Sequence, residues 1–186
     1  MKNLITTVIL GIAMAGFSFA QTSSQVKPGA TEIKIAVVEF SPGQNASEMT
    51  PEAKRQLQAG MAAGLEKTRK FDVADVRWTR NESQDDLAAL NGSSTAAAVK
   101  LGKRLGVSYV LTGTVVEYTP KGADGFGRVV LKTRLIEVAT GKVKHTDETT
   151  QLSTTAMRTT GVAEMHSKTV MPAIKKLSAA IAELKL

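Results

Sequence analysis

Residues 95–118 read TAAAVKLGKRLGVSYVLTGTVVEY, and this stretch decides the fold. Its alanine-rich first half predicts a helix over Thr95–Leu105, with apolar side chains spaced to lie on one face. Gly106 follows at the position where a helix commonly ends in a left-handed residue. The second half, Val107–Tyr118, is rich in β-branched and aromatic residues and predicts a strand. A helix that leads directly into a strand in this way indicates an α/β domain.

The residues before this stretch predict a strand, a helix and a second strand. Glu32–Phe40 is a nearly continuous apolar run, typical of a strand covered on both faces, and a loop over residues 41–49 follows. Thr50 is placed to cap a helix that starts at Pro51 and ends near residues 67–70. The alternation in Phe71–Val76 predicts the second strand.

Two features of this region bear on packing. The first helix has an apolar stripe at every fourth residue, with small residues beside it that permit close approach; the stripe is Leu57, Met61 and Leu65, and the small residues are Ala53, Gly60 and Gly64. Residues 77–94 are polar, and a short helix is expected to start there at Asp85, Asp86 and Leu87.

The residues after Tyr118 predict a hairpin, an edge strand and a final helix. Gly122–Gly127 is interpreted as a hairpin turn, because a phosphate-binding glycine loop has another spacing and opens a helix. Gly127–Val138 alternates as an antiparallel strand with one wet face, and Lys142–Leu152 is polar, as edge strands are. Residues 153–161 predict a loop. Residues 162–184 predict a helix that either starts near Pro172 or is kinked there.

The element order is therefore β-α-β-α-β-β-β-α, which indicates an α/β fold with a mixed sheet of about five strands and helices packed on it. Right-handed crossovers place the first three strands parallel, and the last two add an antiparallel meander. We expect a single folded domain over residues 32–186, after a flexible lead-in at 21–31.

Composition and charge exclude several classes of protein. The chain has 186 residues and no cysteine, which rules out disulfide frameworks, zinc–thiolate and iron–sulfur sites, cysteine nucleophiles and cysteine-anchored lipoproteins. Hydrophobic residues make up 42% of the chain, enough for a globular core, and aromatic residues only 4%, too few for base-stacking platforms.

The first 20 residues have the form of a cleavable export signal. Lys2 is followed by a mostly apolar run to Phe19, with small residues at Ser18 and Ala20, so we expect cleavage after Ala20. An uncleaved anchor is the alternative, but the run is interrupted by glycine and threonine and is short for a membrane span. The mature chain is then periplasmic or associated with the outer membrane.

The predicted location outside the cytoplasm decides how the net charge of +7 is interpreted. An exported basic chain meets anionic envelope surfaces, and we expect no nucleic acid partner. The basic residues occur in scattered groups, which usually form a solvated face: Lys67, Arg69 and Lys70, then Lys103 and Arg104, then Lys175 and Lys176.

The sequence predicts no catalytic, cofactor or metal site. His145 lies in the predicted edge strand and His166 near the start of the last helix, without the spacing of metal ligands. Asp85 and Asp86 are adjacent, so their side chains point apart on a helix, and they fit a helix start better than a paired-carboxylate site. We therefore expect a protein that is not an enzyme.

The segments IKIAVVEF, LEKTRKFDVADV, AAAVKLGKRLGVSYVLTGTVVEY and RVVLKTRLIEVATGKV together resemble the curli-secretion family (CsgG-type). That family is similar in fold to the TolB amino-terminal domain and to outer-membrane activators of penicillin-binding proteins. The resemblance spans about Ile33–Val143, and its most specific parts are Leu105–Val115 and Val138–Lys142. These parts are a helix end, a strand and a turn, so the resemblance implies a scaffold more than a site.

Two departures from that family matter. Curli pore members are lipoproteins, and this chain has no cysteine to acylate. Pore members also carry added hairpins that build a shared barrel. Each strand of such a barrel needs about 9–11 alternating residues to cross the membrane. Residues 118–129 and 149–161 are too short or too polar for such strands.

The leading hypothesis is an exported, non-enzymatic interaction domain in cell-envelope assembly or secretion, with envelope proteins as partners. The alternatives are a subunit of a curli-type outer-membrane export channel, and an envelope enzyme or small-ligand binder. Self-association and peripheral contact with an anionic surface are further expectations. The last helix has an apolar stripe that is either a core face, which its periodicity favours, or a candidate interface: Val170, Ile174, Leu177, Ile181 and Leu184.

Overall fold

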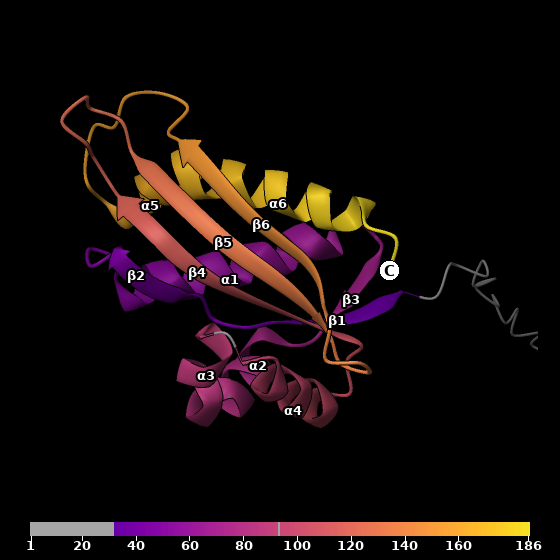
Figure 1. The fold of residues 1–186 in the computed structure, drawn as a ribbon. Coiled ribbons are helices and arrows are strands. Elements are labelled where there is room, and N and C mark those ends of the chain that lie inside the picture. The colour runs from indigo at the N-terminus through magenta and orange to yellow at the C-terminus, as the bar shows by residue number, and fades with distance from the viewer. Residues whose placement is uncertain (1–31, 93) are drawn as a thin grey trace, which may run out of the picture.

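A six-stranded mixed sheet forms the centre of the fold, with helices on both of its faces (Figure 1). The computed structural model describes residues 32–92 and 94–186. Its strands are β1 (Ile33–Val37), β2 (Ser41–Asn45), β3 (Phe71–Val73), β4 (Tyr109–Thr119), β5 (Arg128–Glu137) and β6 (Val143–Leu152). They lie in the order β3-β1-β4-β5-β6, and β2 also pairs with β4. The predicted α/β class with a mixed sheet is confirmed. The predicted export signal lies outside the described residues.

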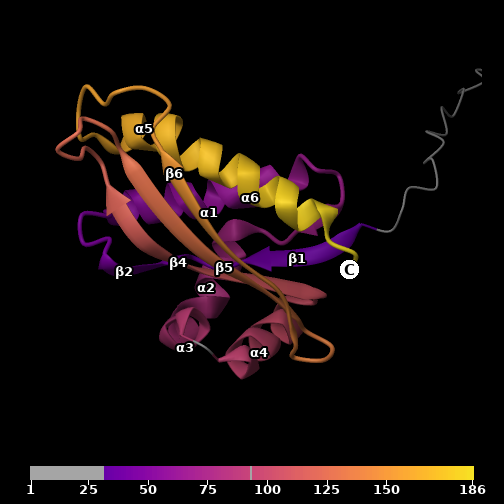
Figure 2. The same cartoon turned by 45° about the horizontal axis from the view of Figure 1, so that its top comes forward.

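The helices form two groups, one on each face of the sheet (Figures 1 and 2). On one face lie α1 (Pro51–Glu66) and α6 (Met171–Glu183), preceded by the short α5 (Val162–Met165). On the other face lie α2 (Val76–Ser83), α3 (Leu87–Asn91) and α4 (Thr95–Leu105), which cover only one end of the sheet. None of the helices in the described part of the chain is long and apolar enough to cross a bilayer.

The stretch at residues 95–118 folds as its sequence predicts. Ser94 caps α4 by accepting a hydrogen bond from the Ala97 N–H at 3.3 Å, and Gly106 ends the helix in the left-handed region with φ +65°. Gly102 lets α4 lie close on the sheet, because a Cβ there would come within 2.2 Å of a Val138 methyl group. The chain then enters β4, the longest strand of the sheet.

Strand directions also follow the prediction. β1 is parallel to β3 and to β4, with Ile35 opposite Val73 on one side and Tyr109 on the other. β4, β5 and β6 are antiparallel neighbours, and the Gly122–Gly127 segment is the hairpin turn between β4 and β5. β6 is the edge strand that its polar sequence predicts.

The loop predicted over residues 41–49 is wrong in its first half, because Ser41–Asn45 is a strand. β4 extends well beyond the end of β1 and leaves unpaired backbone groups on that side, which β2 satisfies by pairing parallel to it. Ser41 lies opposite Thr114, and their hydroxyls are 3.4 Å apart. Gly43 allows β2 to lie close to β4, since a Cβ there would lie 3.0 Å from the Val115 carbonyl oxygen.

The strand predicted at Phe71–Val76 is too long by three residues. Asp75 ends it, because its carboxylate accepts a hydrogen bond from the Trp78 N–H at 2.7 Å and so caps α2. Asp86 lies in the turn before α3 and pairs with Lys100 at 3.2 Å and Arg104 at 3.3 Å. It therefore ties this turn to α4, and the predicted helix start at Asp85–Leu87 is confirmed by α3.

The last helical region runs from α5 into α6 through a π-helical turn, His166–Val170. Pro172 lies at the start of α6, where its missing N–H and bulky ring are accommodated by the wider turn before it. The loop before α5 is held by Glu164, whose carboxylate accepts hydrogen bonds from the Arg158 and Thr159 N–H groups at 3.0 and 2.8 Å. These hydrogen bonds lower the pKa of Glu164.

Each face of the sheet has its own apolar core. The larger core lies under α1 and α6 and includes Leu57, Leu111, Leu131 and Leu177. The smaller core lies under α4 and includes Leu101, Val110 and Ile136. β5 therefore has a wet face only over part of its length, because α4 covers Ile136 while Arg128 and Lys132 stay exposed.

Leu177 is fully buried under α6, so we expect Leu177→Ala to lower the free energy of unfolding by about 2–5 kcal/mol. Lys176→Ala, on the exposed side of the same helix, is the matched control and is expected to change it by less than about 0.5 kcal/mol. Urea unfolding of both variants measures the difference. Equal stability of Leu177→Ala and the wild type would contradict the burial of this side chain.

Candidate functional site

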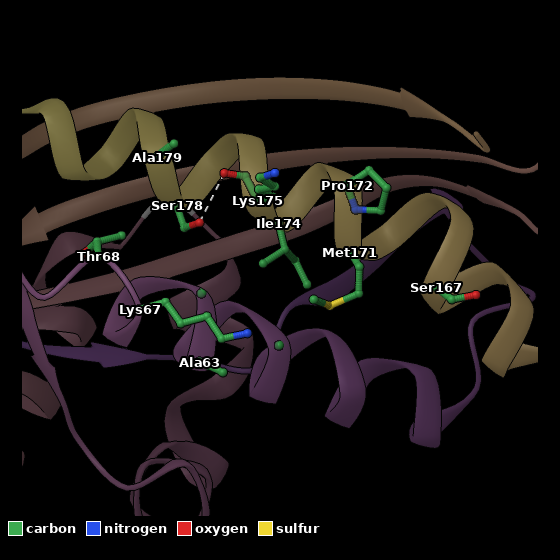
Figure 3. A pocket seen from close by; sticks show the side chains of 12 residues that line it. Ala63, Lys67, Thr68, Ser167, Met171, Pro172, Ile174, Lys175, Ser178 and Ala179 are labelled. Atoms are coloured by element: carbon green, nitrogen blue, oxygen red, sulfur yellow. Dashed lines mark hydrogen bonds between the residues drawn. The ribbon is translucent and has the colours of Figure 1, made fainter.

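A groove of about 750 Å³ runs between α1 and α6 on the side away from the sheet (Figure 3). Its walls come from parts of the chain more than a hundred residues apart, and among the lining residues are Gly60, Ala63, Gly64, Met171, Ile174 and Ala179. Met171 and Ile174 point from α6 toward α1. Most of the floor is therefore apolar, and many of the lining side chains are small.

Two glycines of α1 set the depth of the groove. A Cβ built on Gly60 would lie 2.8 Å from the Ile174 Cδ1, and one on Gly64 would lie 3.0 Å from the Ile174 Cγ2. Both distances are shorter than ordinary carbon contacts, so a side chain at either glycine would require the Ile174 side chain to shift. The close approach that the Gly60–Gly64 spacing predicts is thereby confirmed. Its partner, Ile174, lies on a helix that the sequence alone does not place beside α1.

The rim of the groove is basic. Lys67 extends over it from the end of α1, and Lys175 lines it from α6. Within residues 32–92 and 94–186, neither lysine forms an ion pair. The Thr68 hydroxyl, in the turn after α1, donates to the Leu65 carbonyl oxygen, and the Ser178 hydroxyl donates to the Lys175 carbonyl oxygen within α6. The arrangement suits an occupant with apolar side chains and negative charge.

His166 lies at one end of the helix contact. Its Cε1 is 3.6 Å from the position of a Cβ built on Gly60, and burial lowers the pKa of its imidazole. Met171, next along the groove, remains 36% exposed. The imidazole is therefore favoured in its neutral form beside an otherwise apolar contact.

A buried amide fixes α1 against the sheet and against α2. Gln58 is fully buried, and its Nε2 donates to the Val37 carbonyl oxygen at 2.9 Å. Its Oε1 accepts from Arg80 at 2.8 Å, and Arg80 lies 3.4 Å from a Glu39 carboxylate oxygen. The sequence pattern of α1 does not predict this network. Gln58 is a polar residue next to the apolar stripe, and its partners come from β1 and α2.

The stripe that the sequence offered as a candidate interface lies mostly inside this chain. Val170, Leu177 and Ile181 are buried in the larger core, and Leu184 packs partly buried against it. Ile174 is also in that core, and it alone of the five lines the groove. The open surface of α6 is thus formed by other residues, including Met171, Lys175 and Ala179.

The sequence does not indicate that Lys67 and Lys175 lie at one groove. Both belong to scattered basic groups predicted to form a solvated face, and nothing in the spacing indicates that α1 and α6 are neighbours. Within the described residues, no group of three or more His, Asp or Glu is placed to hold a metal ion. His145 lies on β6, and His166 lies in the π-helical turn before α6.

No protein-family model matches the sequence, and no curated protein matches it. Solved structures do share its fold. The PelC dodecamer from Paraburkholderia phytofirmans has a TM-score of 0.51 and 21% identity, over 79% of this chain and 88% of that chain. Lipoprotein GNA1162 from Neisseria meningitidis has a TM-score of 0.53 and 18% identity, over 82% and 99%.

The hypothetical protein CT253 from Chlamydia trachomatis has a TM-score of 0.58 and 10% identity, over 81% of this chain and 96% of that chain. Identities this low establish a common fold and nothing finer. The chain therefore shares the fold of a dodecamer-forming protein and of a lipoprotein. The resemblance to the curli-secretion family remains a prediction.

His166 should make the free energy of unfolding decrease as pH falls. Its pKa in the folded state lies below the ordinary 6.5, so the unfolded chain takes up the proton first as pH falls. We expect the free energy of unfolding to decrease from pH 7.5 to 5.5, and His166→Gln to remove part of that decrease. Urea unfolding at both pH values checks this. The lowered pKa of Glu164 keeps its protonation below this pH range. The same pH dependence in both proteins would contradict it.

Proposed function

We propose that this chain is an exported, non-enzymatic interaction domain that acts in cell-envelope assembly or secretion. The observation that carries the proposal is the apolar groove with a basic rim between α1 and α6. The shared fold with a lipoprotein and with a protein that assembles into a dodecamer supports a role in the envelope and in assemblies. The signal-like residues 1–20 support export.

The partner segment is proposed to be an acidic, amphipathic helix of an envelope protein. A trough between two helices accepts a third helix through its apolar face, as helix-in-groove recognition does elsewhere. Apolar side chains would contact Met171 and Ile174, and carboxylates on the flanks would pair with Lys67 and Lys175. Both lysines are exposed at the rim, so the charge pairs would steer and orient the partner more than they would tighten it.

Charge reversal at the rim tests this function. Lys67→Glu combined with Lys175→Glu should lower recovery of the partner from envelope extract at least about tenfold, because like charges would then face each other. Folding should be unaffected, since both side chains are exposed and unpaired within the described residues. Crosslinking followed by quantitative mass spectrometry measures the recovery.

Lys103→Glu is the matched control, because it is an exposed lysine on α4, across the sheet from the groove. It should recover the partner as the wild type does. Amino-terminal sequencing of this chain, purified from the envelope extract, should show that it begins at Gln21. Equal recovery by the double variant and the wild type would overturn the role of the groove, and a cytoplasmic protein with an intact Met1 would overturn the function itself.

A further inference from the structure

β6 is a ten-residue edge strand with an unused backbone edge. The Ser153 N–H donates to the Gly127 carbonyl oxygen at 2.8 Å, which directs the backbone groups of Ser153 toward β5. Because these groups alternate in an antiparallel pair, those of Thr146, Glu148 and Thr150 are directed away from β5. Val143–Leu152 contains no proline or glycine, and three threonines add β propensity. On the opposite side of the described sheet, β3 has three residues and β2, which pairs only with β4, has five.

The charges along β6 are arranged symmetrically about Thr146. Lys144 and His145 precede it, and Asp147 and Glu148 follow it. If two copies of the strand pair antiparallel with Thr146 on the two-fold axis, Lys144 lies opposite Glu148 of the second copy, and His145 opposite its Asp147. Each pair occurs twice by symmetry, and opposite charges placed this way stabilise a strand pair.

Neighbouring registers lose this match. An axis at Lys144, Asp147 or Glu148 places that charge opposite itself, and an axis at His145 places Lys144 opposite Thr146. Charged edge residues often serve to block pairing, because like charges that meet repel a second copy. Here one register places Lys144 opposite Glu148 and Asp147 opposite the His145 imidazole, so no like charges meet between Lys144 and Glu148. We propose that two copies of this chain associate along β6, antiparallel about Thr146, into one continuous sheet.

The region around the axis is regular enough to pair. β6 follows β5 without a shift from His145 to Leu152, and the bulge against β5 falls at Lys144, at the end of the paired segment. The Lys144 amine lies 3.4 Å from the Glu137 carboxylate on β5, which holds this side chain at the sheet. Alternate residues Thr146, Glu148 and Thr150 are exposed on the face that the α1–α6 pair does not cover.

The absence of cysteine permits a direct test of the register. Thr146→Cys places one thiol on the axis, where the Cα atoms of a hydrogen-bonded antiparallel pair are about 5.5 Å apart, within the range of a disulfide. Thr150→Cys is the matched control, because the same register places it opposite Lys142 of the second copy. Mild oxidation of the purified exported protein should link the first variant into a dimer and leave the second as single chains. Equal linkage of both, or of neither, would overturn the register.

Two charge variants test the association without a new covalent bond. Light scattering should give the wild type twice the mass of one chain, and Glu148→Lys and Lys144→Glu should each weaken self-association roughly tenfold through like-charge pairs. Mixing the two variants should restore the dimer, since their charges are again complementary. Thermal unfolding checks that each variant is folded. A wild type of single-chain mass at all concentrations, or variants that associate like the wild type, would overturn the proposal.

Discussion

The contact of Ile174 with the glycine side of α1 is the constraint on which this fold depends most. The helices come from opposite ends of the domain, and they pack closely against each other where Gly60 and Gly64 leave room for Ile174. Leu57, Leu177 and Ile181 are buried in the core beneath the pair. The groove follows from this close packing, since the same small residues that bring the helices together leave a trough above their contact.

The two proposed surfaces would work together in an assembly. A two-fold axis through a residue of β6 keeps each face of the sheet on its own side, so the α1–α6 pairs of two copies would share one face. Two basic-rimmed grooves would then face the same side, and a partner with two acidic helices would bind with raised effective concentration. This arrangement rests on both proposals. It gives a physical reason for an interaction domain to associate through its edge strand and leave its helices open.

The sequence predicts the parts of the fold that local patterns determine. The stretch from Thr95 to Tyr118 contains its own capping residue and strand signal, and the structure forms both. The sequence does not predict β2, because SPGQN has no strand pattern. It forms a strand by pairing with the otherwise unpaired edge of β4. The groove escaped prediction for a related reason: its glycines are visible in the sequence, but Lys67 and Lys175 meet only through the packing of α6 on α1.

A double-mutant cycle between Gly60 and Ile174 tests that packing most directly. In the wild type, Gly60→Ala should fail to stabilise the protein, because the new methyl group meets the Ile174 Cδ1 at 2.8 Å. In an Ile174→Val background, which lacks that atom, the same change should stabilise it by about 1 kcal/mol, the helix-propensity advantage of alanine over glycine. Urea unfolding of the four proteins gives both values. Equal stabilisation in the two backgrounds would show that the helices are not in contact there and would contradict the account.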